Sequence, residues 1–392
     1  MQSKHCIAVL AFLCAIPARA EDLGDWTVPP WKAQWGDWTA SLGGLAGGAF
    51  FTAGGNGPVR QEGANLSALF YPRLETTLDE GWEIGIRGAI LAYHDRLAGD
   101  IYGSRTFEKG YLFAQMPYGR FEVGQVDGAG YRLSITGPSV DEAVTLANPS
   151  TTFFRDPQTG RAFIDRFRLN TAELASSNDT KFTYLSPQWF GLQLAGSYTP
   201  YDAHGGLPFV SRGRGGNDRQ SNIFEGAAAF AGYRGALSYG LYASFALAHD
   251  DRHTSAHASL RDWSVGAEAD YPLDDAKLEL GAAYRHSNAY AFDIGDVRAS
   301  GATDAWHIST TLTKGPWIAG FEFAMGDADN ALTRPALDER GYEASIGYVL
   351  NANLQLTLGW QKLRFGRDSG VFFNGSPTAE MNAEFLHLRF HV

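Results

Sequence analysis

The sequence has almost no cysteine, and the two it contains, Cys6 and Cys14, both lie near its start. This region has a basic beginning, an apolar run at 7–16 and small residues around 18–20, the pattern that precedes signal cleavage. Residues 1–20 are therefore predicted to be a secretory signal peptide. The mature chain enters an oxidising compartment without any disulfide, so its stability has to come from other sources.

Long apolar runs and excess positive charge are also lacking. Beyond the signal, no stretch approaches the run of about eighteen apolar residues that a helical membrane span requires. Loss of Lys4 and Arg19 with the signal takes the net charge from −11 to −13, which makes nucleic acid an unsuitable partner. No linker or break in composition divides the rest. We expect an irregular N-terminal extension at 21–36, followed by one large domain at 37–392.

What the sequence does contain is a series of segments with alternating polarity. In the segment 82–94, Ile84 and Ile86 share one face, and Glu83 and Arg87 share the other. A period of two predicts a β-strand with one apolar and one polar face. The same pattern predicts sixteen strands, at 37–47, 64–78, 82–94, 107–116, 118–126, 179–187, 190–200, 221–233, 236–250, 261–272, 276–288, 303–314, 316–327, 339–350, 353–365 and 381–391.

Three features of these segments indicate a membrane barrel. They run for about ten residues, the length a tilted strand needs to cross a bilayer. Their apolar faces begin or end in aromatic residues such as Trp82, Trp317 and Tyr348, as in the aromatic girdles of such barrels. Seven short turns alternate with eight long loops. Because only closure removes the sheet edges in lipid, we predict an all-β, antiparallel, up-and-down transmembrane barrel of sixteen strands around a water-filled channel.

Several stretches resemble the general porins of Gram-negative bacteria. They are YGRFEVGQ at 118–125, KFTYLSPQWFGLQLAGSYTP at 181–200, GYEASIGYVLNANLQLTLGWQKLRF at 341–365 and AEFLHLRFHV at 383–392. The chain departs from the family pattern in ending with His391 and Val392 after Phe390, where such barrels commonly end in an aromatic residue. Its long loop also lacks the Pro-Glu-Phe-Gly tetrapeptide known from enteric members.

The resemblance implies a homotrimeric outer-membrane barrel, surrounded by outer-membrane lipid, whose third external loop folds into the lumen and narrows it. In this sequence that loop is 127–178, which is far longer than an ordinary connection. The resemblance also implies passive diffusion of small hydrophilic solutes and ions, with no catalytic residues, cofactor or metal.

Selectivity in such a channel comes from the charges at its narrowest point. By alternation, four basic residues are predicted to lie on the lumen side of their strands, because a charge facing lipid costs about 2–4 kcal/mol at mid-depth. They are Arg73, Arg87, Arg120 and Lys181.

On the loop, the best candidates for acidic partners are Asp141 and Glu142, where Ser139 is positioned to cap a short helix, together with Asp127. Asp156 and Asp165 are alternatives. The acidic total of the chain favours cations. The loop, however, also has five arginines, which favour anions or tie the loop to acidic wall residues, so the ion preference stays open at this point.

Two other functions remain as alternatives. Aromatic residues near the external loops permit a substrate-selective channel, for example one for sugars. The second alternative is a plugged barrel, or an outer-membrane enzyme with a Ser/His pair facing lipid. His307 and Ser309 share one face of 303–314, but Trp306 and Ile308 form the more apolar face, so we expect the pair to face the lumen.

Overall fold

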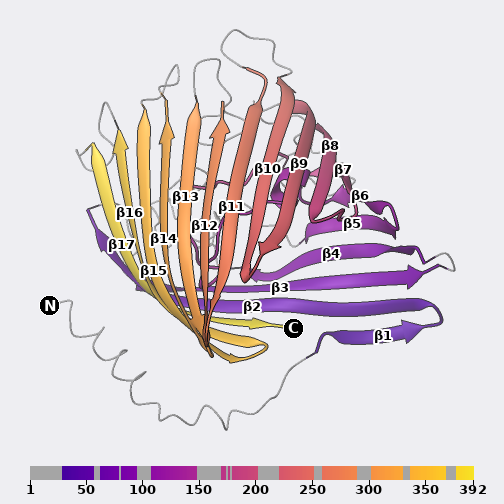
Figure 1. Ribbon diagram of the computed structural model, residues 1–392, viewed down its shortest axis with the longest axis horizontal. Helices are drawn as coiled ribbons and strands as arrows, with labels where there is room; N and C mark the ends of the chain where they lie inside the picture. The colour runs from indigo at the N-terminus through magenta and orange to yellow at the C-terminus, as the bar shows by residue number, and fades with distance from the viewer. Residues whose placement is uncertain are drawn as a thin grey trace.

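The computed structural model describes residues 29–56, 62–78, 81–94, 107–147, 169–173, 175–176, 179–201, 220–250, 258–288, 302–329, 336–367 and 377–392. Within these ranges the chain forms seventeen β-strands and one four-residue helix, α2 (Figure 1). The predicted signal peptide at 1–20 and the loop candidates Asp156 and Asp165 lie outside the described residues. Among the helical residues that are described, none forms a helix long and apolar enough to cross a membrane.

The strands follow the chain in order, with α2 at Ala129–Arg132 between β6 and β7. They are β1 Trp31–Trp35, β2 Trp38–Gly55, β3 Glu62–Thr77, β4 Glu83–His94, β5 Phe107–Met116, β6 Gly119–Gln125, β7 Thr180–Leu185, β8 Leu192–Tyr201, β9 Gln220–Arg234, β10 Leu237–Asp250, β11 Arg261–Leu273, β12 Ala276–Ser287, β13 Thr303–Lys314, β14 Trp317–Ala328, β15 Leu337–Asn351, β16 Leu354–Arg367 and β17 Thr378–His391.

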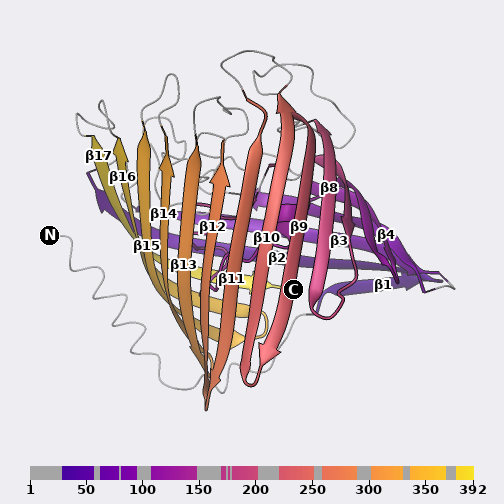
Figure 2. The same cartoon turned by 45° about the horizontal axis from the view of Figure 1, so that its top comes forward.

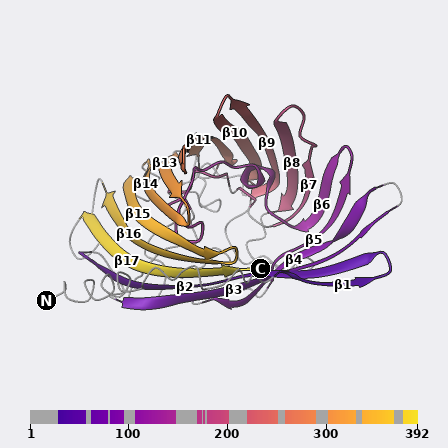
Figure 3. The same cartoon turned by 60° about the horizontal axis from the view of Figure 1, so that its bottom comes forward.

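Strands β2 to β17 form a closed antiparallel barrel of sixteen strands, as predicted. Each pairs with the next along the chain, and β17 pairs with β2 to complete the ring (Figures 2 and 3). The closing register places Phe385 opposite Phe51, and His391 opposite Leu45. Closure removes the open edges of the sixteen-stranded sheet, which is the condition for a β-structure in lipid.

The N-terminal extension differs from the prediction. Residues 21–36 were expected to be irregular because Pro29 and Pro30 oppose regular structure, yet Trp31–Trp35 forms β1. It pairs with Trp38–Leu42 of β2, on the same edge that β17 uses from Leu45 onward. The strand begins only after the two prolines, so they do not interrupt its hydrogen bonds.

Strand β13 shows how the barrel turns polar side chains inward. On β13, His307 and Ser309 are buried, whereas Trp306 and Ile308 are exposed on the outward face. The exposed fraction is 0% for His307 and 55% for Ile308. This confirms that the Ser/His pair faces the lumen side. Buried polar groups inside and apolar side chains outside are the reverse of a soluble domain and are typical of a membrane barrel.

The short connections lie at one end of the barrel and need little chain. Gly235 and Gly315 have φ values of 63° and 56°, a left-handed conformation that glycine adopts without steric cost. Both stand between strands that pair directly, β9 with β10 and β13 with β14. At the other end of the barrel, the loop predicted at 48–63 is shorter than expected, because β2 continues to Gly55.

Described parts of the loop 127–178 lie against the inner face of the barrel. A Cβ added at Gly266 of β11 would stand only 1.9 Å from the carbonyl oxygen of Ile135, so the close approach depends on glycine at this position. Further along, Val144 and Leu146 pack with Phe365 and Phe385 in an apolar cluster between loop and wall. The core of the protein is therefore the seam where this loop meets the barrel.

Candidate functional site

Three arginines on the inner face surround a single phenylalanine ring. Arg73 on β3, Arg87 on β4 and Arg120 on β6 have their guanidinium carbons 5.8, 4.7 and 4.1 Å from the centre of the Phe113 ring on β5. These are distances at which a cation is attracted to an aromatic face. We call this group the arginine cluster. It brings together three of the four basic wall residues selected from the sequence.

The register of the strands produces this arrangement. Arg73 stands directly opposite Arg87, and Phe113 stands between Gly85 of β4 and Glu122 of β6. Gly85 leaves room for the ring, because a Cβ there would lie 2.9 Å from Cε1 of Phe113. Like charges opposite each other in a sheet repel. The ring and the nearby carboxylates are therefore needed to hold the arginines side by side.

Two glutamates at one end of the cluster partly balance Arg73 and Arg87. The Nη2 atom of Arg73 lies 2.7 Å from Oε1 of Glu83, and its Nε contacts Glu75. The Nη2 atom of Arg87 is 4.0 Å from the same Glu83 oxygen, at the limit of an ion pair. Among the described residues, Arg87 is thus the arginine of the cluster whose charge is least neutralised by ion pairs.

A third glutamate is fully buried beneath the cluster. Glu122 accepts from Nε of Arg120 at 2.6 Å and from Nη1 of Arg132 at 2.7 Å. Arg132 comes from α2 at the start of the loop, and alternation along strands could not have placed it here. With it, four guanidinium groups face three carboxylates, so the cluster has an excess of positive charge.

Lys181, the fourth basic candidate, is not part of this cluster. Its side chain is 2% exposed, and its ammonium donates to the carbonyl oxygens of Val126 at 2.6 Å and Ser176 at 3.2 Å. Alternation along β7 indicated an inward side chain. It could not indicate that both limbs of the loop would cover it.

Asp141, on the loop 127–178, packs against the inner wall formed by β16 and β17. It is 1% exposed and accepts hydrogen bonds from the Thr357 hydroxyl at 3.0 Å and the Ala143 amide at 3.0 Å, while Nδ1 of His387 lies at 2.6 Å. Burial alone raises the pKa of Asp141. The hydrogen bond with His387 and the charges of His387 and Arg389 outweigh it and hold the pKa below its ordinary value.

The two other acidic candidates occupy different surroundings. Glu142 has a side chain that is 89% exposed, with Oε2 3.8 Å from Nη1 of Arg389. Asp127 at the start of the loop is paired at 2.5 Å with Lys109 of β5. The structure therefore spreads the three loop acids along the wall. No helix forms at Ser139, and α2 stands earlier in the loop.

Arg389 and His387 were not selected from the sequence, although a signal for them was present. Both alternate with the outward-facing Leu386 and Leu388 on the last strand. The same reasoning that selected Arg73 applies to them. Arg389 lies near Asp141, with 3.7 Å between Nη1 and Oδ1, and donates to Oε1 of Gln355 at 3.3 Å.

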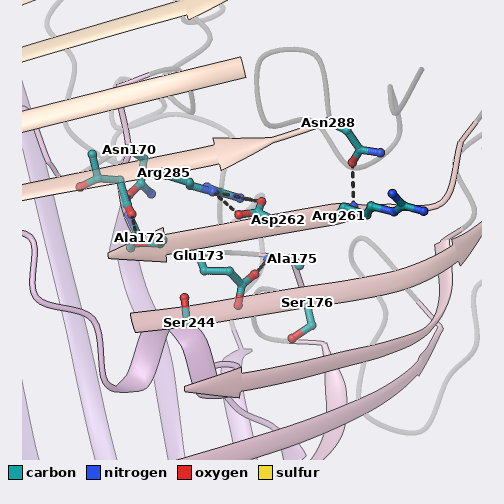
Figure 4. A network of polar contacts seen from close by, with 12 residues as sticks. Asn170, Ala172, Glu173, Ala175, Ser176, Ser244, Arg261, Asp262, Arg285 and Asn288 are labelled. Atoms are coloured by element: carbon teal, nitrogen blue, oxygen red, sulfur yellow. Dashed lines mark hydrogen bonds and ion pairs between the residues drawn. The ribbon is translucent and has the colours of Figure 1, made fainter. Parts of the chain in front are cut away.

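The end of the loop is held by a buried polar network (Figure 4). Arg285 of β12 makes a two-pronged ion pair with Asp262 of β11, with its Nε 2.9 Å from one carboxylate oxygen and 3.0 Å from the other. The Ser264 hydroxyl donates to the Thr171 carbonyl at 2.6 Å. These strands thus fix the end of the loop through side chains on their inner faces.

Glu173, on the loop, is the most enclosed acid of this network. Its side chain is 0% exposed and accepts from the Ala175 amide. Burial raises the pKa of Glu173 well above its ordinary value, and the nearby negative charges of Glu225 and Asp262 raise it further. The positive charge of Arg285 offsets part of this effect.

Sequence comparison identifies a family for nearly the whole chain. The sequence model that describes Gram-negative porins matches residues 7–380. No curated protein matches the chain in sequence.

Solved structures with the same fold include several outer-membrane proteins. An outer-membrane expressed OmpT of Vibrio cholerae is 11% identical, with a TM-score of 0.56 over 92% of this chain and 100% of that one. An anion-selective porin from Comamonas acidovorans is 12% identical, with a TM-score of 0.55 over 91% and 100%. A mutant of the Rh. blastica porin is 17% identical, with a TM-score of 0.51 over 90% and 100%. At these identities the likeness is one of fold.

Proposed function

This chain belongs to the Gram-negative porin family and is an outer-membrane channel protein, and from this premise we propose that small hydrophilic solutes and ions cross it by passive diffusion. The proposal assigns the chain no catalytic step. Its support is the closed barrel with polar groups inside, since sixteen strands enclose more space than side chains of the wall alone can fill.

The narrow part of the channel is proposed to lie where the arginine cluster faces the lumen, with the inserted loop 127–178 opposite. The observation that carries this is the gathering of Arg73, Arg87 and Arg120 around Phe113. The arginine side chains keep exposed fractions of 32%, 31% and 13%, so solutes can reach them. Charges on such a wall act strongly, because low-dielectric surroundings focus their field.

The channel is proposed to prefer anions. Four guanidinium groups and three carboxylates meet at the cluster, and one of these carboxylates, that of Glu122, is fully buried. The negative net charge of the whole chain points the other way. Charge near the narrowest point outweighs charge on distant loops, since exposed charges are screened beyond about 10 Å at ordinary salt.

The assembly is proposed to be a homotrimer in contact with outer-membrane lipid. Support comes from a solved structure of similar fold, the trimer form of Vibrio cholerae OmpT, with 11% identity and a TM-score of 0.55. The apolar outward faces of the strands fit lipid. Gel electrophoresis without heating should show a band of trimer size that falls to monomer on boiling. A monomer band at every temperature, from barrel that is folded by circular dichroism, would exclude a stable trimer.

Planar-bilayer recording tests the diffusion proposal. The purified chain should give open-channel steps in symmetric KCl, and a sugar added in excess should not block them. Block that saturates with one sugar would favour the substrate-selective alternative. Silence from a correctly folded barrel would favour a plugged one.

A further inference from the structure

The ammonium group of Lys181 lies where the two limbs of the inserted loop come together. The outgoing limb leaves the barrel after β6, and the returning limb enters β7. Lys181 donates to the Val126 carbonyl of the first at 2.6 Å and to the Ser176 carbonyl of the second at 3.2 Å. One side chain therefore spans the neck of the 52-residue loop 127–178.

Glu225 of β9 makes the matching contacts from the other side. Its Oε1 accepts from the Ser176 amide at 2.9 Å, and its Oε2 accepts from the Ser197 hydroxyl at 2.7 Å. The oxygen of Ser197 in turn accepts from the Ala129 amide on the outgoing limb at 3.1 Å. The outgoing limb also passes close to Glu225, because a Cβ at Gly128 would lie 1.8 Å from Oε2. Both limbs are thus bonded to this carboxylate, one directly and one through Ser197.

Burial makes it costly to leave either of these two charged groups without partners. The exposed fractions of Lys181 and Glu225 are 2% and 5%. Lysine and glutamate are rarely buried to this extent unless they are paired, because a lone charge loses its hydration. The positive charge of Lys181 acts among the negative charges of Glu225, Asp179 and Asp127, so each of them makes burial of the ammonium less costly.

We infer that Lys181 and Glu225 form a clasp across the neck of the inserted loop, and that Lys181 positions the constriction instead of lining it. Without the ammonium, the Val126 and Ser176 carbonyls lose a donor and the Glu225 carboxylate loses a neutralising charge. The returning limb is then free to move away from the outgoing limb while the barrel stays closed. This assignment rests on the proposed channel function only for its electrical consequence.

Two variants and one control test the clasp. Lys181→Met keeps the length of the side chain and removes its donors and charge. Glu225→Gln keeps the size and removes the charge. Lys277→Met is the control, because Lys277 also lies on an inner face, where it is paired with Glu279 on the same strand at 2.6 Å. Each full-length protein is refolded and checked for the heat-dependent shift in mobility of an intact barrel.

Limited trypsin digestion of the folded barrels is the first readout, because it does not depend on conduction. Mass spectrometry follows cleavage after arginines between 127 and 178. Loss of the clasp should speed cleavage by about tenfold in Lys181→Met and by a smaller factor in Glu225→Gln, the effect expected when a buried donor or charge is removed. Lys277→Met should be cleaved at the unmodified rate.

Single-channel recording is the second readout. Lys181→Met should give open-channel current that fluctuates between sublevels, with an unchanged reversal potential. Unmodified cleavage and quiet current with a shifted reversal potential would overturn the clasp and make Lys181 a lining charge. Should Lys181→Met fail to fold, Glu225→Gln decides, and unmodified cleavage there would also overturn the clasp. A chain that does not conduct at all contradicts the channel proposal, while the cleavage comparison still judges the clasp.

Discussion

The guanidinium carbon of Arg120 lies 4.1 Å from the centre of the Phe113 ring, closer than that of either neighbouring arginine. An aromatic face attracts a cation without neutralising it, unlike a carboxylate. The ring is 4% exposed, so its surface is almost wholly covered by its neighbours. Phe113 therefore holds the arginines in place and leaves their charge available to solutes.

Replacing Phe113 with leucine should weaken the proposed preference for anions. Leucine fills much of the same space but offers no aromatic face, so the arginines can move toward Glu83 and Glu122. Loss of about 0.5–1 kcal/mol of cation–π attraction predicts a change of about twofold to fivefold in the anion-to-cation permeability ratio. Reversal potentials in asymmetric KCl measure it. Phe113→Trp retains the face and is the control, and an equal change in both variants would contradict this role.

Removing Arg87 should shift selectivity toward cations. Its 4.0 Å distance from Glu83 leaves its charge less neutralised than that of Arg73, which lies 2.7 Å from the same residue. In Arg87→Gln the reversal potential should move toward the value for potassium, because three arginines then face three glutamates. Lys277→Gln, outside the cluster, should leave it nearly unchanged. A larger shift in the lysine variant would place the selective charges elsewhere.

Acid should release the loop from the wall at Asp141. Because the pKa of Asp141 is lowered in the folded protein, its contribution to stability is present above the ordinary value of about 3.9 and is lost as the pH falls through the folded value. We expect steady current from neutral pH down to about 4 and increasing fluctuation below it. In Asp141→Asn the fluctuation should be present at neutral pH, since the buried partner His387 loses about 1–3 kcal/mol of interaction. Steady current from this variant at all pH values would contradict the anchoring role.

Alkali should loosen the returning limb at Glu173. Its raised pKa means that the folded loop favours the protonated acid, so this stability is complete below the ordinary value of about 4.3 and is lost as the pH rises through the folded value. The facing groups are Glu225, Asp262 and Arg285. Trypsin cleavage within 127–178, corrected for the pH dependence of trypsin on an unfolded peptide, should therefore speed up with pH. Glu173→Gln should flatten that dependence, and an unchanged slope in the variant would exclude Glu173 as its source.

The strands were predictable because their signal is local. A period of two placed a strand at 82–94 and another at 353–365, and the structure has β4 at Glu83–His94 and β16 at Leu354–Arg367. The same alternation predicted that Arg73, Arg87 and Arg120 face inward, where they surround Phe113. Strand β1 was missed because the Pro29-Pro30 pair was taken to make all of 21–36 irregular. The effect of the prolines ends at Pro30, and β1 begins at the next residue.

The partners of the loop were not predictable, because no local pattern encodes them. Asp141 and His387 meet at 2.6 Å although 246 positions separate them in the chain. Lys181 was rightly placed on the inner side of β7. Whether such a side chain meets water or protein depends on where the loop returns, and one sequence does not determine that. Arg132 joins Glu122 for the same reason, through the position of α2.

The reversal potential of single open channels in asymmetric KCl tests the central claim most directly. The account predicts open-channel steps whose reversal potential lies on the chloride side of zero, and a move toward potassium in Arg87→Gln. Steps that reverse on the potassium side and do not respond to this substitution would contradict the claim that the arginine cluster governs passage through the channel.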